Sequence, residues 1–203
     1  VGYIGQREAL PVLLDGLQRL EYRGYDSAGV AVVAGGETRV AKRQGRLREL
    51  EAALTDLPAG SRVGIGHTRW ATHGRPSDRN AHPHTDASGR FAVVHNGIIE
   101  NYAELREELA RQGCVFRSET DTEVIPHLIA SHYDGDLVQA VRRAVSRLRG
   151  AFALAVVCEQ EPDRIVAVRV ASPLVIGLGE GEHLLASDIP ALLPYTRRVI
   201  AME

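Results

Sequence analysis

The stretch 67–101 places polar, small and turn-forming residues directly after two short apolar segments. The first segment, 63–67, leads into Thr-Arg-Trp-Ala-Thr-His-Gly, and the second, 91–94, leads into His-Asn-Gly-Ile-Ile-Glu-Asn. Short apolar runs bounded by turn residues predict strands, and a rigid scaffold usually presents its chemistry where strands end. The fold therefore has to contain these two strands, and function is to be sought at their ends.

The rest of the chain alternates between helical and β-type apolar spacing. Helices are predicted over about 10–22, 47–57 and 136–148, and two more are predicted to begin at the capping-box pairs Asn101/Glu104 and Thr120/Glu123. A loop is predicted at 24–29, and short strands at 1–4, 30–33, 38–41, 152–158, 164–170, 174–178, 183–186 and 196–202. One α+β domain of stacked antiparallel sheets with helices on the outer faces accounts for this order.

Composition and charge narrow the classes of function. The 203 residues are 44% hydrophobic and 25% charged, as in an ordinary globular domain, and the net charge of -2 gives no general attraction to nucleic acid or membranes. No apolar run approaches the roughly 20 residues that span a bilayer, and no secretory signal is expected ahead of Val1. Cys114 and Cys158 lie on predicted strands without C-x-x-C spacing, so a reducing, cytoplasmic setting is expected.

The pair Asn96-Gly97 supports two compatible interpretations. Asn-Gly between apolar runs is the strongest short signal for a β-hairpin turn. The pair is also suited to an oxyanion hole, in which the Asn96 amide and the Gly97 N–H point at one oxygen. A tight turn would aim both donors at the same spot, so neither interpretation excludes the other.

Three further residues each have a structural and a functional interpretation. Arg69 is either a solvated surface arginine or a fork that binds a substrate carboxylate, and its uncharged and aromatic neighbours favour the second. Trp70, the single tryptophan, is either a core residue or a lid. Asp121 is expected in the first turn of a helix, where the dipole favours a carboxylate, and its alternative role is to bind an ammonium group.

Five of the eight histidines fall between His67 and His95. They suggest a metal site built on His82-Pro-His84 with Asp86, but no second cluster has a regular ligand spacing. We therefore expect no metal, and we interpret these histidines as hydrogen-bonding braces of the loops.

Seven blocks of sequence carry a resemblance to a known family. They are Val-Gly-Tyr-Ile-Gly at 1–5, Leu-Glu-Tyr-Arg-Gly-Tyr-Asp-Ser-Ala-Gly at 20–29, the segment 67–74, Asn-Ala-His-Pro-His at 80–84, the segment 95–101, Ser-Glu-Thr-Asp-Thr-Glu at 118–123 and Ser-Pro-Leu-Val-Ile-Gly at 172–177. Together they resemble the class II glutamine amidotransferases, in particular the glutaminase domains of the glutamine:fructose-6-phosphate aminotransferase (glucosamine-6-phosphate synthase) family. The sibling amidophosphoribosyltransferase and asparagine synthetase families are not expected to carry Glu-Tyr-Arg-Gly-Tyr-Asp or Thr-Arg-Trp-Ala-Thr-His-Gly.

The resemblance implies a fold and an activity for residues 1–203. The fold is that of an N-terminal-nucleophile hydrolase, a four-layer sandwich with two antiparallel β-sheets between helical layers. The activity is hydrolysis of the glutamine side-chain amide to glutamate and ammonia. The ammonia would be used to convert fructose-6-phosphate to glucosamine-6-phosphate, and no cofactor is implied.

The resemblance also assigns roles to individual residues. Asn96 and Gly97 would hold the oxyanion, Arg69 the α-carboxylate and Asp121 the α-ammonium group of glutamine. The remaining assignments are the glutamine pocket for Thr72 and His73, ammonia gating for Trp70, a brace near the nucleophile for Arg23, and support of the site for His82 and His95.

The family pattern begins Cys-Gly-Ile-Val-Gly, and its cysteine attacks glutamine with its own α-amino group as the base. This chain begins at the Val of that pattern, so the nucleophile is expected three residues ahead of Val1. Further strands and two sugar isomerase domains are expected after Glu203, and the full-length protein is expected to be a homodimer. The alternatives are a glutaminase domain of another class II amidotransferase and a non-catalytic glutamine-binding module.

Overall fold

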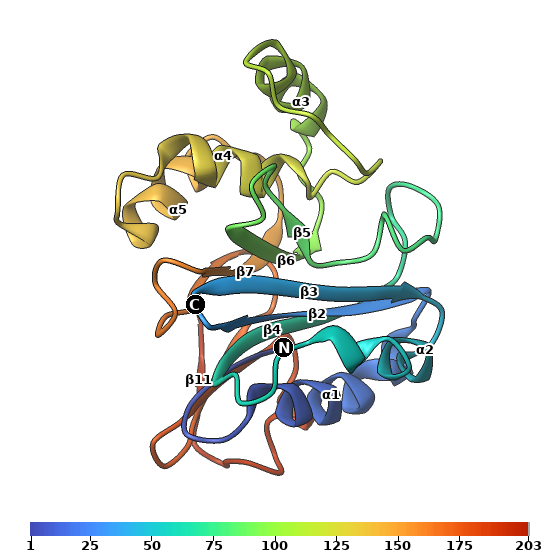
Figure 1. Ribbon diagram of the computed structural model, residues 1–203, viewed down its shortest axis with the longest axis vertical. Helices are drawn as coiled ribbons and strands as arrows, with labels where there is room; N and C mark the ends of the chain where they lie inside the picture. The colour runs from blue at the N-terminus through green and yellow to red at the C-terminus, as the bar shows by residue number, and fades with distance from the viewer. Residues whose placement is uncertain (203) are drawn as a thin grey trace.

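The computed structural model describes residues 1–202, which form two antiparallel β-sheets packed face to face (Figure 1). The first sheet has seven strands in the order β11-β9-β10-β1-β4-β2-β3. They are β1 (Gly2–Ile4), β2 (Ser27–Ala34), β3 (Glu37–Gln44), β4 (Val63–Arg69), β9 (Val175–Leu178), β10 (His183–Ala186) and β11 (Val199–Ala201). The second sheet has the order β5-β6-β7-β8, with β5 (His84–Thr85), β6 (Phe91–Gly97), β7 (Phe152–Cys158) and β8 (Val166–Val170).

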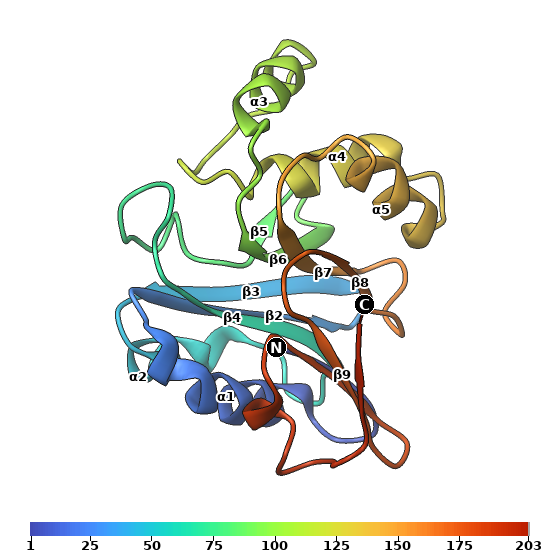
Figure 2. The same cartoon turned by 180° about the vertical axis from the view of Figure 1, so that it is seen from behind.

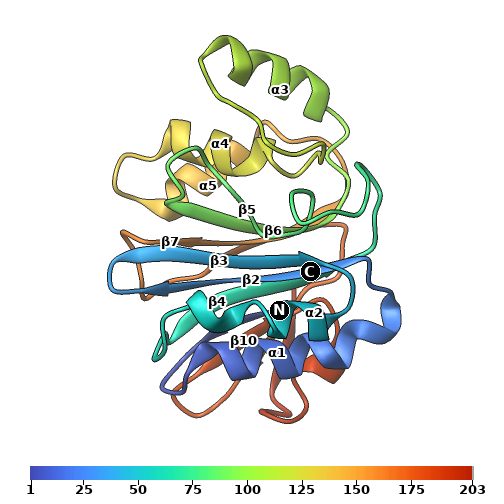
Figure 3. The same ribbon diagram turned by 45° about the vertical axis from the view of Figure 1, so that its right-hand side comes forward.

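Helices cover the outer face of each sheet (Figures 2 and 3). Helices α1 (Ala9–Leu20) and α2 (Leu47–Glu51) pack on the seven-stranded sheet, and α4 (Val124–His132) and α5 (Leu137–Val145) pack on the four-stranded sheet. Helix α3 (Tyr102–Arg111) contacts α4, and short 3-10 turns form at η1 (Glu21–Arg23), η2 (Leu54–Asp56) and η3 (Ile189–Ala191). The four layers predicted from the sequence are therefore confirmed. Within residues 1–202, no helix has the length and apolar character needed to cross a membrane.

The alternation of side chains along β4 separates two layers of core. Ile65 points between the sheets, whereas Gly64 and Gly66 face α1. A Cβ on Gly64 would lie 2.9 Å from Cδ1 of Leu13, and a Cβ on Gly66 would lie 3.0 Å from Cδ1 of Leu17. The two glycines therefore let α1 pack closely, and the other face of the strand is left to the space between the sheets.

The sequence predicted where α3 and α5 begin, but it did not predict every hydrogen bond made by the residues at these helix starts. Helix α3 begins where its capping box indicates, but the Asn101 side chain instead donates to the Arg147 carbonyl and accepts from the Arg149 N–H, both at 2.9 Å. It therefore ties α3 to the residues that follow α5. The predicted start of α5 is confirmed, because the Asp136 carboxylate accepts from the Gln139 N–H at 3.1 Å.

Helix α4 begins at Val124, later than its capping box predicts. The Glu123 carboxylate accepts hydrogen bonds from the backbone N–H groups of Arg117 (2.8 Å) and Ser118 (2.6 Å). It therefore fixes the preceding loop, and the prediction of a capping box that starts the helix at Thr120 is wrong.

Other boundaries differ where pairing between distant segments overrides the local pattern. The helix predicted over 47–57 is broken into α2 and η2. Strand β2 begins at Ser27, inside the predicted loop 24–29, because it pairs with both β3 and β4. Cys114 follows α3 and lies on no strand, whereas Cys158 lies on β7 as predicted.

Candidate active site

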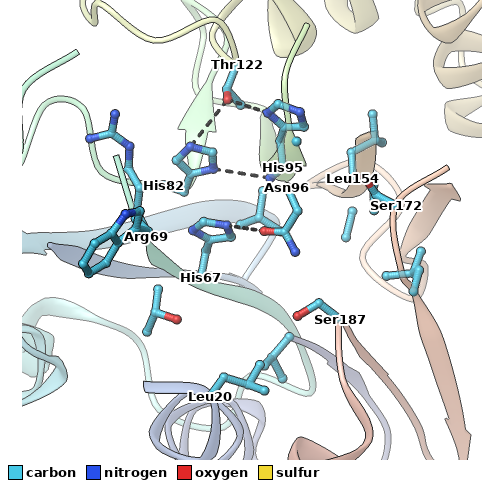
Figure 4. A pocket seen from close by; sticks show the side chains of 18 of the residues that line it. Leu20, His67, Arg69, His82, His95, Asn96, Thr122, Leu154, Ser172 and Ser187 are labelled. Carbon is cyan, nitrogen blue, oxygen red and sulfur yellow. Dashed lines mark hydrogen bonds between the residues drawn. The ribbon is translucent and has the colours of Figure 1, made fainter. Parts of the chain in front are cut away.

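The alternation that points Ile65 between the sheets continues to the end of β4 and places His67 and Arg69 in the same row. On the facing sheet, Val94 of β6 points into the core between the sheets, and Asn96 is next in that row. Both rows therefore change from apolar to polar at the same end of the space between the sheets. A cavity of about 360 Å³ opens there (Figure 4).

The cavity gathers segments that are far apart in the sequence. Every predicted site residue except His73 lines it, namely Arg23, Arg69, Trp70, Thr72, His82, His95, Asn96, Gly97 and Asp121. They come from η1, from the ends of β4 and β6, from the loop before β5 and from the segment before α4. The tertiary structure thus brings together residues that the sequence marks in separate blocks.

Asn96 and Gly97 are the last residues of β6, where they pair with Ala153 and Phe152 of β7. The interpretation of Asn-Gly as a hairpin turn is therefore wrong. Gly97 has φ 110°, and a Cβ there would lie 2.1 Å from the carbonyl oxygen of Ala151, so only glycine fits this close approach. The strand, and not a turn, aims this pair at the cavity.

Arg69 is buried at the end of β4, so the surface interpretation is wrong. Its Nη2 donates to the carbonyl oxygens of His73 and Gly74, the second at 3.1 Å. Its Nη1 lies 3.8 Å from Asp26 Oδ1 and makes no hydrogen bond within residues 1–202. Burial lowers the pKa of Arg69, and the nearby carboxylates of Asp26 and Asp121 oppose this shift. The site thus holds a charged fork with an unused donor.

Asp121 lies before α4 and not in its first turn, which removes the helix-dipole explanation for this carboxylate. It is only 3% exposed and lines the cavity. Oδ2 accepts from the Ile99 N–H at 2.8 Å, and Oδ1 makes no hydrogen bond within the described residues. On either side, Thr120 and Thr122 bond to buried histidines, so the segment that carries Asp121 is rigidly held.

The buried histidines form a braced stack (Figure 4). The rings of His67 and His82 lie 4.3 Å apart at 17°, and the Thr122 hydroxyl bonds to His95 Nδ1 (2.8 Å) and His82 Nε2 (3.4 Å). Burial lowers the pKa of His67 to about 3 and that of His95 to about 4, and it lowers the pKa values of His82 and His84 well below their usual range. All four are therefore neutral at pH 7, and each makes a side-chain hydrogen bond to another segment of the chain. Among residues 1–202, no group of three or more His, Cys, Asp or Glu side chains is placed to hold a metal ion.

The residues at the cavity mouth are more exposed. Trp70 is 69% exposed, so it is not a core residue. Its ring covers Gly24, where a Cβ would lie 2.1 Å from the ring. Arg23 Nη1 donates to Ser187 Oγ at 3.3 Å, which links η1 to the residue after β10. His73 contributes its backbone carbonyl to Arg69, and Thr72 lies at the rim.

Three residues of the site were not singled out from the sequence: His67, Asp26 and Thr122. Asp26 accepts from the backbone N–H of Ala71 and faces Arg69, so it holds the loop after β4. His67 could have been found from alternation, since it lies two positions before Arg69 on one strand. No local pattern pointed to Asp26 or Thr122, because their partners lie far along the chain.

Residues 67–194 match the model of a family described as the glutamine amidotransferase domain. The chain belongs to this family. Curated relatives of this glutamine amidotransferase domain are named glutamine–fructose-6-phosphate aminotransferase [isomerizing], with 85% identity in Symbiobacterium thermophilum and 61% in Aquifex aeolicus. Both matches cover the whole chain but only 33% and 34% of the relatives, so the domain spans about a third of their length.

Solved structures agree with the four-layer architecture. A glutamine phosphoribosylpyrophosphate amidotransferase from B. subtilis superposes with a TM-score of 0.82 at 28% identity, covering 96% of this chain and 43% of that one. A class II glutamine aminotransferase domain protein from Silicibacter pomeroyi, at 18% identity and a TM-score of 0.57, shares the fold. The glutamine amidotransferase domain thus has the N-terminal-nucleophile hydrolase fold expected from its sequence.

Proposed function

We propose that this domain hydrolyses the side-chain amide of glutamine to glutamate and ammonia, and that the ammonia is used to convert fructose-6-phosphate to glucosamine-6-phosphate. The observation that carries the proposal is that Arg69 and Asp121 line the same cavity. The two buried side chains have opposite charges, and each keeps one polar atom free of hydrogen bonds within residues 1–202. This is the arrangement that the α-carboxylate and α-ammonium groups of an amino acid need.

The cavity also suits the length of glutamine. Its volume of about 360 Å³ lies at the lower end of the roughly 300–1,000 Å³ typical of small-molecule sites. With the amino-acid end of glutamine between Arg69 and Asp121, its side chain extends toward the end of β6. There the Asn96 side-chain amide and the Gly97 N–H would donate hydrogen bonds to the amide oxygen as it becomes negative.

The proposed nucleophile is a cysteine three residues ahead of Val1. Strand β1 runs antiparallel to β4 with Gly2 opposite Ile65, so three further residues in that register would run beside His67, Thr68 and Arg69. An α-amino group has a pKa of about 7.7–8.0, so a useful fraction is unprotonated at neutral pH and can take the thiol proton. Arg23 would brace this end of the strand.

The reaction then proceeds in two halves. The thiolate attacks the amide carbon, the carbonyl oxygen becomes negative, and the amide nitrogen takes a proton and leaves as ammonia. The remaining thioester is hydrolysed by water, which releases glutamate and restores the thiol. Trp70, exposed over the cavity mouth, would gate the passage of ammonia to the rest of the protein.

The use of the ammonia to convert fructose-6-phosphate is proposed for the whole protein and not for this domain alone. The relatives that match this chain are named as isomerizing aminotransferases of fructose-6-phosphate and are about three times its length. We propose sugar isomerase domains in the same polypeptide, a homodimeric full-length protein and a cytoplasmic location.

The test compares three versions of the protein with verified N-termini. One begins at Val1, one has Cys-Gly-Ile ahead of Val1, and one has Ser-Gly-Ile there. We expect glutamate and ammonia release only from the Cys version, with the Ser version far slower because a hydroxyl is a much weaker nucleophile at neutral pH. Equal turnover by the version that begins at Val1 would overturn the N-terminal-cysteine mechanism, and glutamine binding without hydrolysis in all three would indicate a binding module.

A further inference from the structure

We propose that His67 is a positioning residue that holds the Asn96 amide in the one orientation able to stabilise an oxyanion. The proposal rests on the glutamine hydrolysis proposed above and adds to it a residue with a defined task. His67 lies at the end of β4 and Asn96 at the end of β6, so the contact bridges the two sheets beside the cavity (Figure 4).

The contact itself fixes the direction of the hydrogen bond. His67 Nε2 lies 2.8 Å from Asn96 Oδ1, and an amide oxygen can only accept, so Nε2 carries the proton. Burial lowers the pKa of His67 to about 3, so the ring is neutral at pH 7 and Nδ1 is bare. Asn96 Nδ2 makes no hydrogen bond within residues 1–202, so its N–H groups are available to the cavity.

The orientation matters because the two ends of an asparagine amide are nearly the same shape and differ in polarity. A rotated Asn96 amide would point Oδ1 at the cavity, where it would repel the oxygen that becomes negative during attack. The other tautomer of His67, with the proton on Nδ1, would favour this rotated state because Nε2 would then accept from Nδ2. The tautomer of one buried histidine thus decides whether the site presents a donor or an acceptor.

Neighbouring contacts hold the His67 ring in place. It stacks on His82 with ring centres 4.3 Å apart. His82 is fixed at both nitrogens, since Nδ1 accepts from the His95 N–H at 3.3 Å and Nε2 contacts the Thr122 hydroxyl at 3.4 Å. His67 Nδ1 is buried without a hydrogen-bond partner among the described residues, so a proton there would be a buried donor without an acceptor.

The kinetic test uses the full-length enzyme with its N-terminal cysteine. His67→Met removes the N–H donor and replaces the ring with an apolar side chain of similar volume. It should lower kcat for glutamine hydrolysis at least about tenfold, short of the roughly 10²–10³-fold loss expected for Asn96→Ala, and leave KM within about threefold. His67→Gln, which restores an N–H donor, should recover most of the lost rate. His127→Leu is the matched control, because His127 is buried in α4 against Phe116 and does not line the cavity.

A double-mutant cycle separates positioning from general stability. In an Asn96→Ala background there is no amide to orient, so His67→Met should cost little further kcat. Full additivity of the two losses would overturn the proposal, as would unchanged kcat in the single His67→Met variant. A wild-type enzyme without any glutamine hydrolysis would instead refute the proposed function.

The tautomer can be read independently of activity. In protein labelled with ¹⁵N-histidine, NMR should show His67 protonated at Nε2 only, with no titration between pH 5 and about pH 9. This result would stand even if the domain were only a glutamine-binding module. A proton on Nδ1 would overturn the inference.

Discussion

Replacing Arg69 with Lys should weaken glutamine capture far more than turnover of the bound substrate. The Arg69 guanidinium uses Nη2 to hold the carbonyls of His73 and Gly74 and keeps Nη1 free of hydrogen bonds within residues 1–202. A lysine has a single nitrogen, which cannot hold these carbonyls and at the same time donate to a substrate carboxylate. The positive charge is kept, so the experiment isolates the geometry of the fork.

The number of lost bonds sets the size of the effect. A hydrogen bond to a charged group contributes about 1.5–3 kcal/mol, and about 1.4 kcal/mol corresponds to tenfold in binding. Losing the hydrogen bond from Nη1 to the α-carboxylate should therefore lower kcat/KM by about 10- to 150-fold. The carboxylate is equally charged before and during the attack, so kcat at saturating glutamine should change by less than about threefold.

The assay is glutamate release over a range of glutamine concentrations, with the full-length enzyme. Arg43→Lys is the matched control, because Arg43 lies on β3 and is paired at the surface with Asp78 at 3.7 Å. Thermal unfolding of both variants shows whether the loop after β4 still folds. A kcat/KM for Arg69→Lys within threefold of the wild type would remove Arg69 from substrate binding, and a loss confined to kcat would refute the carboxylate role.

Three further predictions follow from the same site. Asn96→Ala should lower kcat about 10²–10³-fold with little change in KM, measured alongside the free energy of unfolding, and a loss wholly in KM would make Asn96 a binding residue. A glutamine analogue without the α-amino group should bind far more weakly than glutamine by calorimetry, and equal affinity would argue against Asp121 as the ammonium site. The pKa values of His67 and His95, about 3 and about 4 in the folded protein, lie below the ordinary value near 6.5, so the unfolded chain takes up protons first as the pH falls. The free energy of unfolding should thus have its full value above pH 6.5. Below that pH it should fall by about 1.4 kcal/mol per pH unit for each of the two histidines. Urea unfolding at pH 7 and about pH 5.5 measures this loss of stability. The loss should be smaller in His67→Gln than in the wild type, and it should be unchanged in His183→Gln, because His183 is exposed. An equal loss in all three proteins would contradict the role given to His67.

Periodic apolar patterns determined most of the architecture in advance. The runs at 63–67, 91–94 and 152–158 became β4, β6 and β7, and the spacing from Leu10 became α1. Such patterns succeed because burial of one face is a local requirement that each element must meet by itself. The two-residue strand β5 carries no period and gave no such signal.

Local rules failed where a side chain found a distant partner. The Asn101 side chain contacts the segment after α5 instead of capping α3, and the Glu123 carboxylate fixes the loop before α4. The Asn96-Gly97 pair has the composition of a turn, yet it continues β6 because β7 supplies the pairing partners. In each case the tertiary contact outweighed the local preference.

The sequence by itself determined which residues are available for chemistry, since the blocks around Arg69, Asn96 and Asp121 can be recognised without a structure. Only the tertiary structure decided how those residues are buried, protonated and hydrogen-bonded. It placed the three around one cavity and buried Arg69 with an unused donor. It also kept the stacked histidines neutral and set His67 against Asn96. The physical reason is that burial, pKa and hydrogen-bond direction depend on neighbours contributed by other strands, whereas periodicity and motif are properties of one segment.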